Sequence, residues 1–314
     1  MIKKKIVCVC PVSLSKNILF PKKKNKKIVI KKNVSGKRLQ GNNLIRFLSN
    51  ANIAIIGLEK VSKQVIDKLP KLKGVVKYGV GEDNIDINYL KKKKIKYTNT
   101  KGVNNVSVAE LALSFALIIL KKIFINYEII KRKKKWSREI GFDLRKKKIG
   151  IVGLGNVGRE TSLIFKKLGC EIYVNDIIDM SKWSKKNKMI FTSLSNIKKK
   201  CDVISFHVPL TLKTKNIINN NFLNKCKKNI IIINTSRGGI SNLHHIKKFL
   251  KKNKGASYAT DVFPEEPWKV ESIVNLENFY CTPHIGGSTF ESINTMANAT
   301  EKNLTRLIKQ TLSK

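Results

Sequence analysis

Residues 149–176 constrain the fold more than any other part of the chain. An apolar run (Ile149–Val152) leads into a glycine turn with the sequence GLGNVG (Gly153–Gly158), and a helical pattern follows. A second apolar run (Ile172–Val174) ends at Asp176. Strand, glycine turn, helix, strand and acid in this order are the full context of a dinucleotide-binding fingerprint.

Each glycine of this turn has a separate physical purpose. Gly153 permits the tight turn, Gly155 lets a pyrophosphate approach the backbone, and Gly158 lets the helix pack closely on the strand. The start of the helix then offers free N–H groups and its positive dipole end to the pyrophosphate. Asp176, 23 residues after Gly153, is placed to accept hydrogen bonds from a ribose 2′-hydroxyl. A carboxylate repels a 2′-phosphate, so the pattern predicts NAD rather than NADP.

The chain is strongly basic, with 64 Lys and Arg against 21 Asp and Glu, a net charge of +43 over 314 residues. A polyanionic partner such as nucleic acid is one interpretation. The other is mutational bias, because Lys, Ile and Asn are the residues of A/T-rich codons. The lysines are spread over the whole chain in short runs such as 91–94, 133–135 and 198–200 rather than gathered in one domain among aromatic residues. We therefore favour compositional bias and expect no specific nucleic-acid partner.

The six cysteines form no CxxC pair, so we expect buried free thiols in a reducing compartment and no metal site. The charged start is followed by an apolar stretch that Pro11 interrupts, which favours a first strand over a signal peptide. The apolar segment Val108–Leu120 is too short to span a membrane and contains Glu110. These features predict a cytoplasmic protein with no membrane partner, and a buried or interface helix over this segment.

Short apolar runs alternate with helical patterns along both halves of the chain, which predicts parallel sheets with crossover helices. In the first half we expect helices at 43–50 and 62–69, and a basic, polar connection between the helix from Val106 and Leu144. The C-terminal stretch 290–312 is expected to be helical. Strands are expected at 6–10, 28–30, 53–56, 74–78 and 95–98, and then at 203–206, 230–234, 257–260 and 279–281.

Three predicted strand ends carry residues that suit acid–base chemistry on a carboxylate substrate. Arg237 follows a strand and precedes two glycines, a setting that suits a bidentate clamp on a carboxylate. Glu266 lies in a segment stiffened by prolines, and His284 follows the last strand. A His beside a carboxylate has its charged form favoured and can donate a proton near neutral pH. His207, also at a strand end, is expected to be structural or to line the cofactor site.

These motifs resemble those of the D-isomer-specific 2-hydroxyacid dehydrogenases, and most closely their phosphoglycerate dehydrogenase branch. The resemblance covers nearly the whole chain in seven ordered motifs: KYGVGEDNID (77–86), NTKGVNNVSVAEL (99–111), GIVGLGNVGRE (150–160), CDVISFHVPLTLKT (201–214), IINTSRGGI (232–240), ATDVFPEEPW (259–268) and TPHIGGST (282–289).

The resemblance implies a catalytic triad of Arg237, Glu266 and His284. His284 would exchange the hydroxyl proton, Glu266 would orient His284 and favour its protonated form, and Arg237 would bind the carboxylate and polarise the carbonyl. The implied substrate contacts are Tyr78, Gly79, Val80, Gly81, Asn104 and Arg237. The implied NAD contacts are Val80, Gly153, Gly155, Asn156, Val157, Gly158, Asp176, Val208, Thr235, Ser236, Arg237, Asp261, His284, Ile285, Gly286 and Gly287.

The resemblance also implies an α/β fold of two doubly wound parallel-sheet domains. A flavodoxin-like substrate domain would comprise residues 1–100 and 288–314, and a Rossmann NAD-binding domain residues 101–287. A homodimer, or a dimer of dimers, would form through the helix from Val106 to Leu120. The chain resembles the short form without a regulatory C-terminal domain, so we expect no inhibition by serine.

The activity that this resemblance implies is the NAD-dependent oxidation of D-3-phosphoglycerate to 3-phosphohydroxypyruvate in L-serine biosynthesis. One departure matters: where that branch places an Arg-Ser pair that helps to bind phosphate, this chain has Ile56-Gly57. Glyoxylate or hydroxypyruvate reduction and a D-lactate-type activity therefore stay open, as do the physiological direction and the choice between dimer and tetramer. A protein of another class, an NAD-sensing corepressor with the same fold, is the further alternative.

Overall fold

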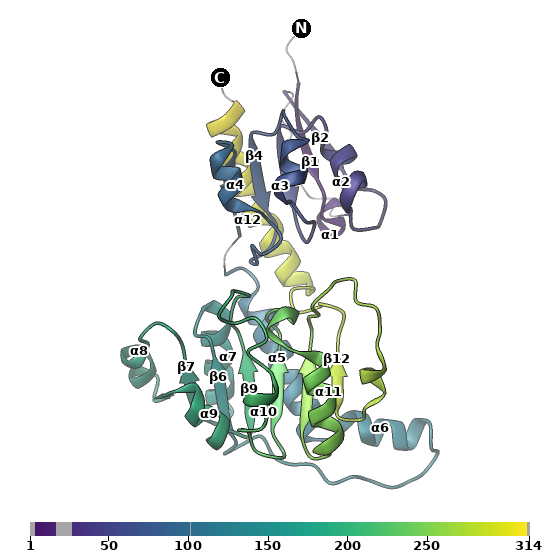
Figure 1. Ribbon diagram of the computed structural model, residues 1–314, viewed down its shortest axis with the longest axis vertical. Coiled ribbons are helices and arrows are strands. Elements are labelled where there is room, and N and C mark those ends of the chain that lie inside the picture. Colours follow the sequence, from purple (N-terminus) through teal and green to yellow (C-terminus); the bar gives the residue numbers. More distant parts are fainter. Residues whose placement is uncertain (1–3, 17–26, 101, 313–314) are drawn as a thin grey trace. The chain divides into compact units, whose positions relative to one another are not determined.

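The computed structural model describes residues 4–16, 27–100 and 102–312, and it divides the chain into two compact units. Unit 1 comprises residues 1–104 and 288–314, and unit 2 comprises residues 105–287 (Figure 1). The sequence-based boundary at residue 101 lies outside the described residues. No helix of the described part is both long and apolar enough to cross a membrane.

Unit 1 is built on a parallel sheet of five strands in the order β2-β1-β3-β4-β5. This is the flavodoxin-like order, in which the direction of winding reverses between β1 and β3. The strands are β1 (Lys5–Val9), β2 (Ile28–Lys32), β3 (Ile53–Ile56), β4 (Gly74–Lys77) and β5 (Lys96–Thr98). The helices are α1 (Val12–Lys16), α2 (Gly41–Leu48), α3 (Lys63–Asp67), α4 (Ile87–Lys92) and α12 (Phe290–Leu312).

Both faces of this sheet are covered, because β1, β3 and β4 alternate apolar side chains between two cores. Cys8, Ala54 and Val75 pack with α2, α3 and α4 on one face. Ile53 and Ile55 pack on the other face with side chains of α12, which returns from the far end of the chain. The C-terminal helix therefore completes the fold that the N-terminal residues begin.

Unit 2 contains a parallel sheet of seven strands in the order β12-β11-β10-β9-β6-β7-β8. This is the Rossmann order, with the reversal between β6 and β9. The strands are β6 (Lys148–Val152), β7 (Glu171–Asn175), β8 (Ile190–Phe191), β9 (Val203–Phe206), β10 (Ile231–Asn234), β11 (Ser257–Thr260) and β12 (Phe279–Cys281). The helices are α5 (Asn105–Leu120), α6 (Ile123–Lys131), α7 (Asn156–Lys167), α8 (Ser181–Lys186), α9 (Leu194–Lys200), α10 (Asn220–Leu223) and α11 (Leu243–Lys252), with 3₁₀ turns η1 (Gly238–Ile240) and η2 (Ser272–Asn275).

The predicted strands all form, with ends that shift by a residue or two. The connection expected between α5 and Leu144 was wrong in one respect, because it contains the helix α6. The neighbouring lysines make the apolar pattern of this helix hard to recognise in the sequence. Ile129 is buried, whereas Phe124 and Tyr127 are about half exposed. α5 packs against α7 and β10, which accounts for its apolar sequence.

Candidate active site

The glycine turn after β6 is tightly packed except at one position. Gly153 has a φ of +94°, a conformation that side chains other than glycine rarely adopt. A Cβ atom on Gly158 would lie 1.8 Å from the carbonyl oxygen of Gly153. On Gly155, which caps the start of α7, a Cβ would meet nothing within 4 Å. The turn thus leaves open space beside the N–H groups of a helix start, which fits a pyrophosphate.

Asp176 lies directly after β7 and holds the glycine turn. Its Oδ2 accepts the N–H of Leu154 at 2.6 Å, and its Oδ1 accepts the N–H of Ile178 at 3.0 Å. The next residue, Ile177, is 98% exposed and carries no charge. A carboxylate fixed here and followed in the sequence by an uncharged residue suits a ribose 2′-hydroxyl and disfavours a 2′-phosphate.

His207 and Val208 follow β9, the strand beside β6 in the sheet. A Cβ on Gly153 would lie 2.9 Å from Val208 Cγ1, so Val208 packs directly on the turn. The Nε2 atom of His207 lies 2.9 Å from Ser205 Oγ, whereas its buried Nδ1 has no partner among the described residues. Burial lowers the pKa of His207 to about 3, so the ring is neutral at physiological pH. His207 therefore forms part of the surface beside the glycine turn and does not act as a proton carrier.

The loop after β10 is held by Asn234, a residue that the sequence analysis did not single out. Its fully buried side chain accepts the N–H of Ser236 at 3.1 Å and donates to the carbonyl oxygen of Arg237 at 3.0 Å. The neighbouring Thr235 hydroxyl is buried. An Asn opening the NTSRGG motif directly after an apolar strand was the available signal, because Asn side chains commonly bond the backbone two residues on.

Asp261, after β11, organises the loop that carries His284. Its carboxylate is 1% exposed and accepts the Thr282 hydroxyl at 2.6 Å and the N–H groups of Ile285 at 2.7 Å and Gly286 at 2.8 Å. Burial raises the pKa of Asp261 against the effect of these bonds. His284 itself has a φ of +56°, a strained conformation for a residue with a side chain. The three hydrogen bonds to the Asp261 carboxylate fix the loop on both sides of His284 in this conformation.

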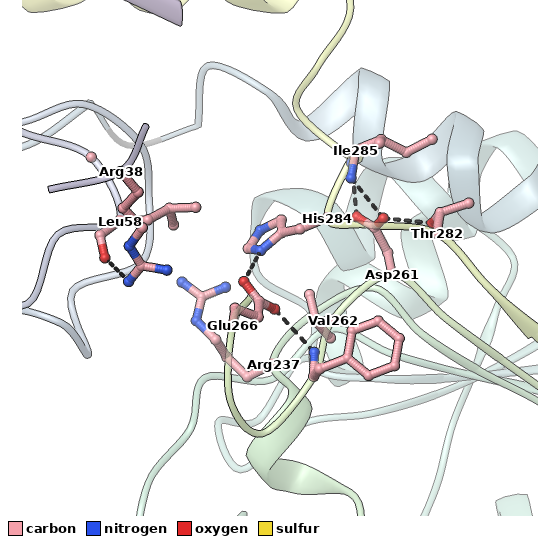
Figure 2. A network of polar contacts seen from close by, with 12 residues as sticks. Arg38, Leu58, Arg237, Asp261, Val262, Glu266, Thr282, His284 and Ile285 are labelled. Carbon is pink, nitrogen blue, oxygen red and sulfur yellow. Dashed lines mark hydrogen bonds and ion pairs between the residues drawn. The ribbon is translucent and has the colours of Figure 1, made fainter. Parts of the chain in front are cut away.

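His284 and Glu266 form a close pair at the end of this loop (Figure 2). The Nδ1 atom of His284 lies 2.6 Å from Glu266 Oε2, and Glu266 Oε1 accepts the N–H of Phe263 at 3.0 Å. The side chains are 31% and 22% exposed, so solvent-borne molecules can reach them. Figure 2 shows the guanidinium of Arg237 pointing toward this pair. With Nδ1 engaged, Nε2 is the atom of His284 that can exchange a proton with a ligand.

Four of the five predicted substrate contacts in unit 1, residues 78–81, lie in the turn after β4. The N–H of Tyr78 donates to the carbonyl of Ile56 at 2.8 Å, and that of Gly79 donates to Thr100 Oγ1 at 3.0 Å. A carboxylate would therefore have to use the N–H groups of Val80 and Gly81. Asn104 is half-buried at the end of the first segment of this unit. Among the described residues, no group of three or more His, Cys, Asp and Glu side chains is arranged to hold a metal ion.

Comparison with known proteins agrees with this geometry. The family model described as "D-isomer specific 2-hydroxyacid dehydrogenase, NAD binding domain" matches residues 113–286, more than half of the chain. The chain belongs to this family. As a 2-hydroxyacid dehydrogenase it is an NAD-dependent oxidoreductase that acts on the CH–OH group of 2-hydroxy acids.

Its relatives carry more than one activity. The dehydrogenase is 34% identical to a glyoxylate reductase of Thermococcus litoralis, over 80% of this chain and 78% of that protein. It is also 34% identical to a D-3-phosphoglycerate dehydrogenase of Methanocaldococcus jannaschii, over 79% of this chain but 48% of that protein. The fold is that of a D-lactate dehydrogenase from Aquifex aeolicus solved with NAD and lactic acid (TM-score 0.83, 24% identity, 98% of this chain and 96% of that one).

Proposed function

We propose that Arg237, Glu266 and His284 are the catalytic residues for the reversible reduction of a small 2-keto acid to a D-2-hydroxy acid. The observation that carries this proposal is the 2.6 Å contact between His284 Nδ1 and Glu266 Oε2. A carboxylate that accepts the Nδ1 proton fixes the orientation of the ring and leaves Nε2 to carry the proton that keto-acid reduction requires.

In the reducing direction, His284 Nε2 donates its proton to the carbonyl oxygen as C2 of the substrate becomes tetrahedral. Arg237 binds the substrate carboxylate and draws electron density toward the carbonyl oxygen. Glu266 accepts the Nδ1 proton and orients the ring during the transfer. When bound, NAD supplies the hydride as NADH or accepts it as NAD⁺. In the opposite direction, neutral His284 takes the hydroxyl proton.

For the substrate we propose the pair 3-phosphoglycerate and 3-phosphohydroxypyruvate, which would place the enzyme in L-serine biosynthesis. Seven motifs that resemble the phosphoglycerate dehydrogenase branch, the presence of Asn104, and a relative of that name at 34% identity support this choice. The second candidate is glyoxylate or hydroxypyruvate reduction. Gly57 favours it, because a Cβ there would lie 3.1 Å from Pro11 Cγ, so that a side chain at the second position of the Arg-Ser pair would be crowded.

Steady-state NADH oxidation by the purified protein with phosphohydroxypyruvate, hydroxypyruvate and glyoxylate tests the proposal. A preference of about 100-fold in kcat/KM for phosphohydroxypyruvate over hydroxypyruvate, roughly 2.7 kcal/mol of transition-state binding, would support the first candidate. Equal or reversed values would favour the second. Failure to oxidise NADH with any 2-keto acid would refute the catalytic proposal itself.

We further propose a homodimer in a reducing, cytoplasmic compartment. Unit 2 exposes apolar side chains on α6 and the segment after it, with Phe124 50%, Trp136 97% and Ile140 82% exposed, and the six cysteines are unpaired. Sedimentation of wild type and Tyr127→Glu, which puts a charge on this face, tests the dimer. Val34→Glu in unit 1, where the side chain is 90% exposed, is the matched control. A monomeric wild type would refute it.

A further inference from the structure

The turn after β4 (residues 79–84) is anchored at its start by Thr100, which lies two residues after β5. Thr100 is 2% exposed, and its hydroxyl accepts the N–H of Gly79 at 3.0 Å and donates to the carbonyl of Gly79 at 3.2 Å. Gly79 has a φ of +117°, a conformation that residues with side chains rarely adopt. One buried hydroxyl therefore bonds both polar backbone groups of the residue that opens the turn.

The end of the same turn is anchored by Asn84 to the loop after β3 (residues 57–60). The Nδ2 atom of Asn84 donates to the carbonyls of Gly57 at 2.9 Å and Glu59 at 2.6 Å, and its Oδ1 accepts from Lys77 Nζ at 2.8 Å. Lys77 and Glu59 are each 2% exposed and bond the carbonyl and the N–H of Gly57, respectively. The end of the turn and the loop after β3 thus form one hydrogen-bonded assembly.

The middle of the turn is held by Glu82, whose carboxylate faces β5 and the residue after it. Its Oε1 accepts the Tyr97 hydroxyl at 3.1 Å and also accepts from Asn99 Nδ2. Burial raises the pKa of Tyr97, and the negative charge of Glu82 raises it further. The Tyr97 hydroxyl therefore keeps its proton and acts as a donor to Glu82 at physiological pH.

Val80 and Gly81, which carry the proposed carboxylate contacts, lie between the anchored residues Gly79 and Glu82. Two successive N–H groups bind one anion well only when the backbone already holds both in the required direction. A glycine at position 81 gives the backbone additional freedom, so this direction has to be imposed from outside the pair. Thr100 imposes it on one side, and the bonds of Glu82 impose it on the other.

The charge of Glu82 does not by itself explain why an acid lies beside a site for an anion. A carboxylate at this place repels a bound carboxylate, so its direct electrostatic effect on substrate binding is unfavourable. Its two hydrogen bonds to Tyr97 and Asn99 act in the other direction, because they fix the backbone next to Gly81. The balance between these two effects can be measured.

We propose that Glu82, bonded by Tyr97, is a positioning residue that holds the N–H groups of Val80 and Gly81 in place for the substrate carboxylate. The inference rests on the proposed function, in which a 2-keto acid is reduced and its carboxylate binds this turn. It adds the side chains that keep the turn in a binding conformation. Because every 2-keto acid carries this carboxylate, the effect is the same whichever one is the substrate.

The test compares two tyrosine substitutions that each remove a bond from a hydroxyl to a carboxylate in unit 1. Tyr97→Phe removes the donor to Glu82 and keeps the ring. Tyr89→Phe is the matched control, because the Tyr89 hydroxyl donates to Asp67 Oδ1 at 2.6 Å and joins α4 to α3. We expect Tyr97→Phe to raise KM roughly 3- to 10-fold, and equally for glyoxylate and hydroxypyruvate, with kcat and the KM for NADH changed less than about twofold. The control should change no constant by more than about twofold.

Substitutions of Glu82 separate positioning from charge. Glu82→Ala should raise KM for both keto acids by at least as much as Tyr97→Phe. Glu82→Gln keeps an acceptor oxygen and removes the charge, so it should recover part of this loss. A lower KM in either variant would mean that repulsion of the substrate by Glu82 outweighs positioning, which would overturn the inference. Equal KM values for Tyr97→Phe and Tyr89→Phe would also overturn it.

Calorimetric titration with oxamate in the presence of NADH separates the inference from the proposed function. Oxamate carries a carboxylate beside a carbonyl group, as a 2-keto acid does, and its binding requires no turnover. If wild type reduces no keto acid but binds oxamate more tightly than Tyr97→Phe does, the positioning role stands and the proposed reaction falls. If wild type reduces keto acids and Tyr97→Phe leaves their KM and the affinity for oxamate unchanged, the positioning role falls and the reaction stands.

Discussion

In both units the winding of the sheet reverses at an equivalent place, but the residues there differ in chemical character. Between β6 and β9, unit 2 has two glycines without room for side chains, Gly153 and Gly158, and it has His207, which burial keeps neutral. Between β1 and β3, unit 1 has the buried charges Lys77 and Glu59 and the guanidinium of Arg38, which donates to the carbonyl oxygen of Leu58. The residues in unit 2 suit close approach of the backbone to an extended cofactor. The residues in unit 1 suit recognition of a small acid through its charge.

The largest expected effect separates chemistry from cofactor binding within unit 2. His284→Gln keeps a side chain of similar size but removes the exchangeable imidazole proton. We expect kcat to fall by about 10³-fold, the range for loss of a general acid–base group. NADH binding, followed by fluorescence titration, should stay within a factor of about three. A parallel collapse of NADH affinity would show that His284 acts mainly on the cofactor.

The glycine turn allows a matched pair of substitutions. Gly158→Ala places a methyl group against the Gly153 carbonyl and should cost about 3 kcal/mol of unfolding free energy. Gly155→Ala meets no protein atom within 4 Å, so it should leave the melting temperature nearly unchanged. It should weaken NADH binding by roughly tenfold, because the methyl group would occupy space that the pyrophosphate needs. If Gly155→Ala binds NADH normally, the open space serves another purpose.

Much of this comparison was predictable from the sequence, though unevenly. The GLGNVG turn and the apolar runs dictate the Rossmann unit because local pattern and global fold agree there. The pairing of His284 with Glu266 was indicated by their places near the ends of two predicted strands and was named as catalytic by the resemblance, although 18 residues separate them. The Arg38–Leu58 contact, spanning 20 residues between two loops, has no sequence signal. Asn234 could have been found from its place directly after an apolar run, whereas the hydrogen bonds of Asp261 to the His284 loop have no sequence signal.

The buried charges of unit 1 should be energetically coupled. Lys77→Met removes the cation that bonds the Gly57 carbonyl and Asn84, and should destabilise unit 1 by about 3 kcal/mol. Adding Glu59→Gln should recover part of this loss, because the glutamate otherwise stays buried without its nearby cation. Urea unfolding of the two single variants and the double variant measures the coupling. Strictly additive losses would mean that Lys77 and Glu59 hold the loop independently.

The smallest expected effect concerns His207 of unit 2, and it changes the free energy of unfolding only at acidic pH. Burial depresses the pKa of His207 from 6.5 to about 3, so below pH 6.5 the unfolded chain binds a proton that the folded chain does not. Stability that is complete above pH 6.5 is therefore lost as the pH falls, by about 2 kcal/mol near pH 5. His207→Gln should remove this part of the pH dependence while lowering stability uniformly. Unfolding free energies of both proteins between pH 5 and 8 measure the difference. Parallel curves would mean that His207 takes up a proton in the folded state, which would contradict a neutral His207.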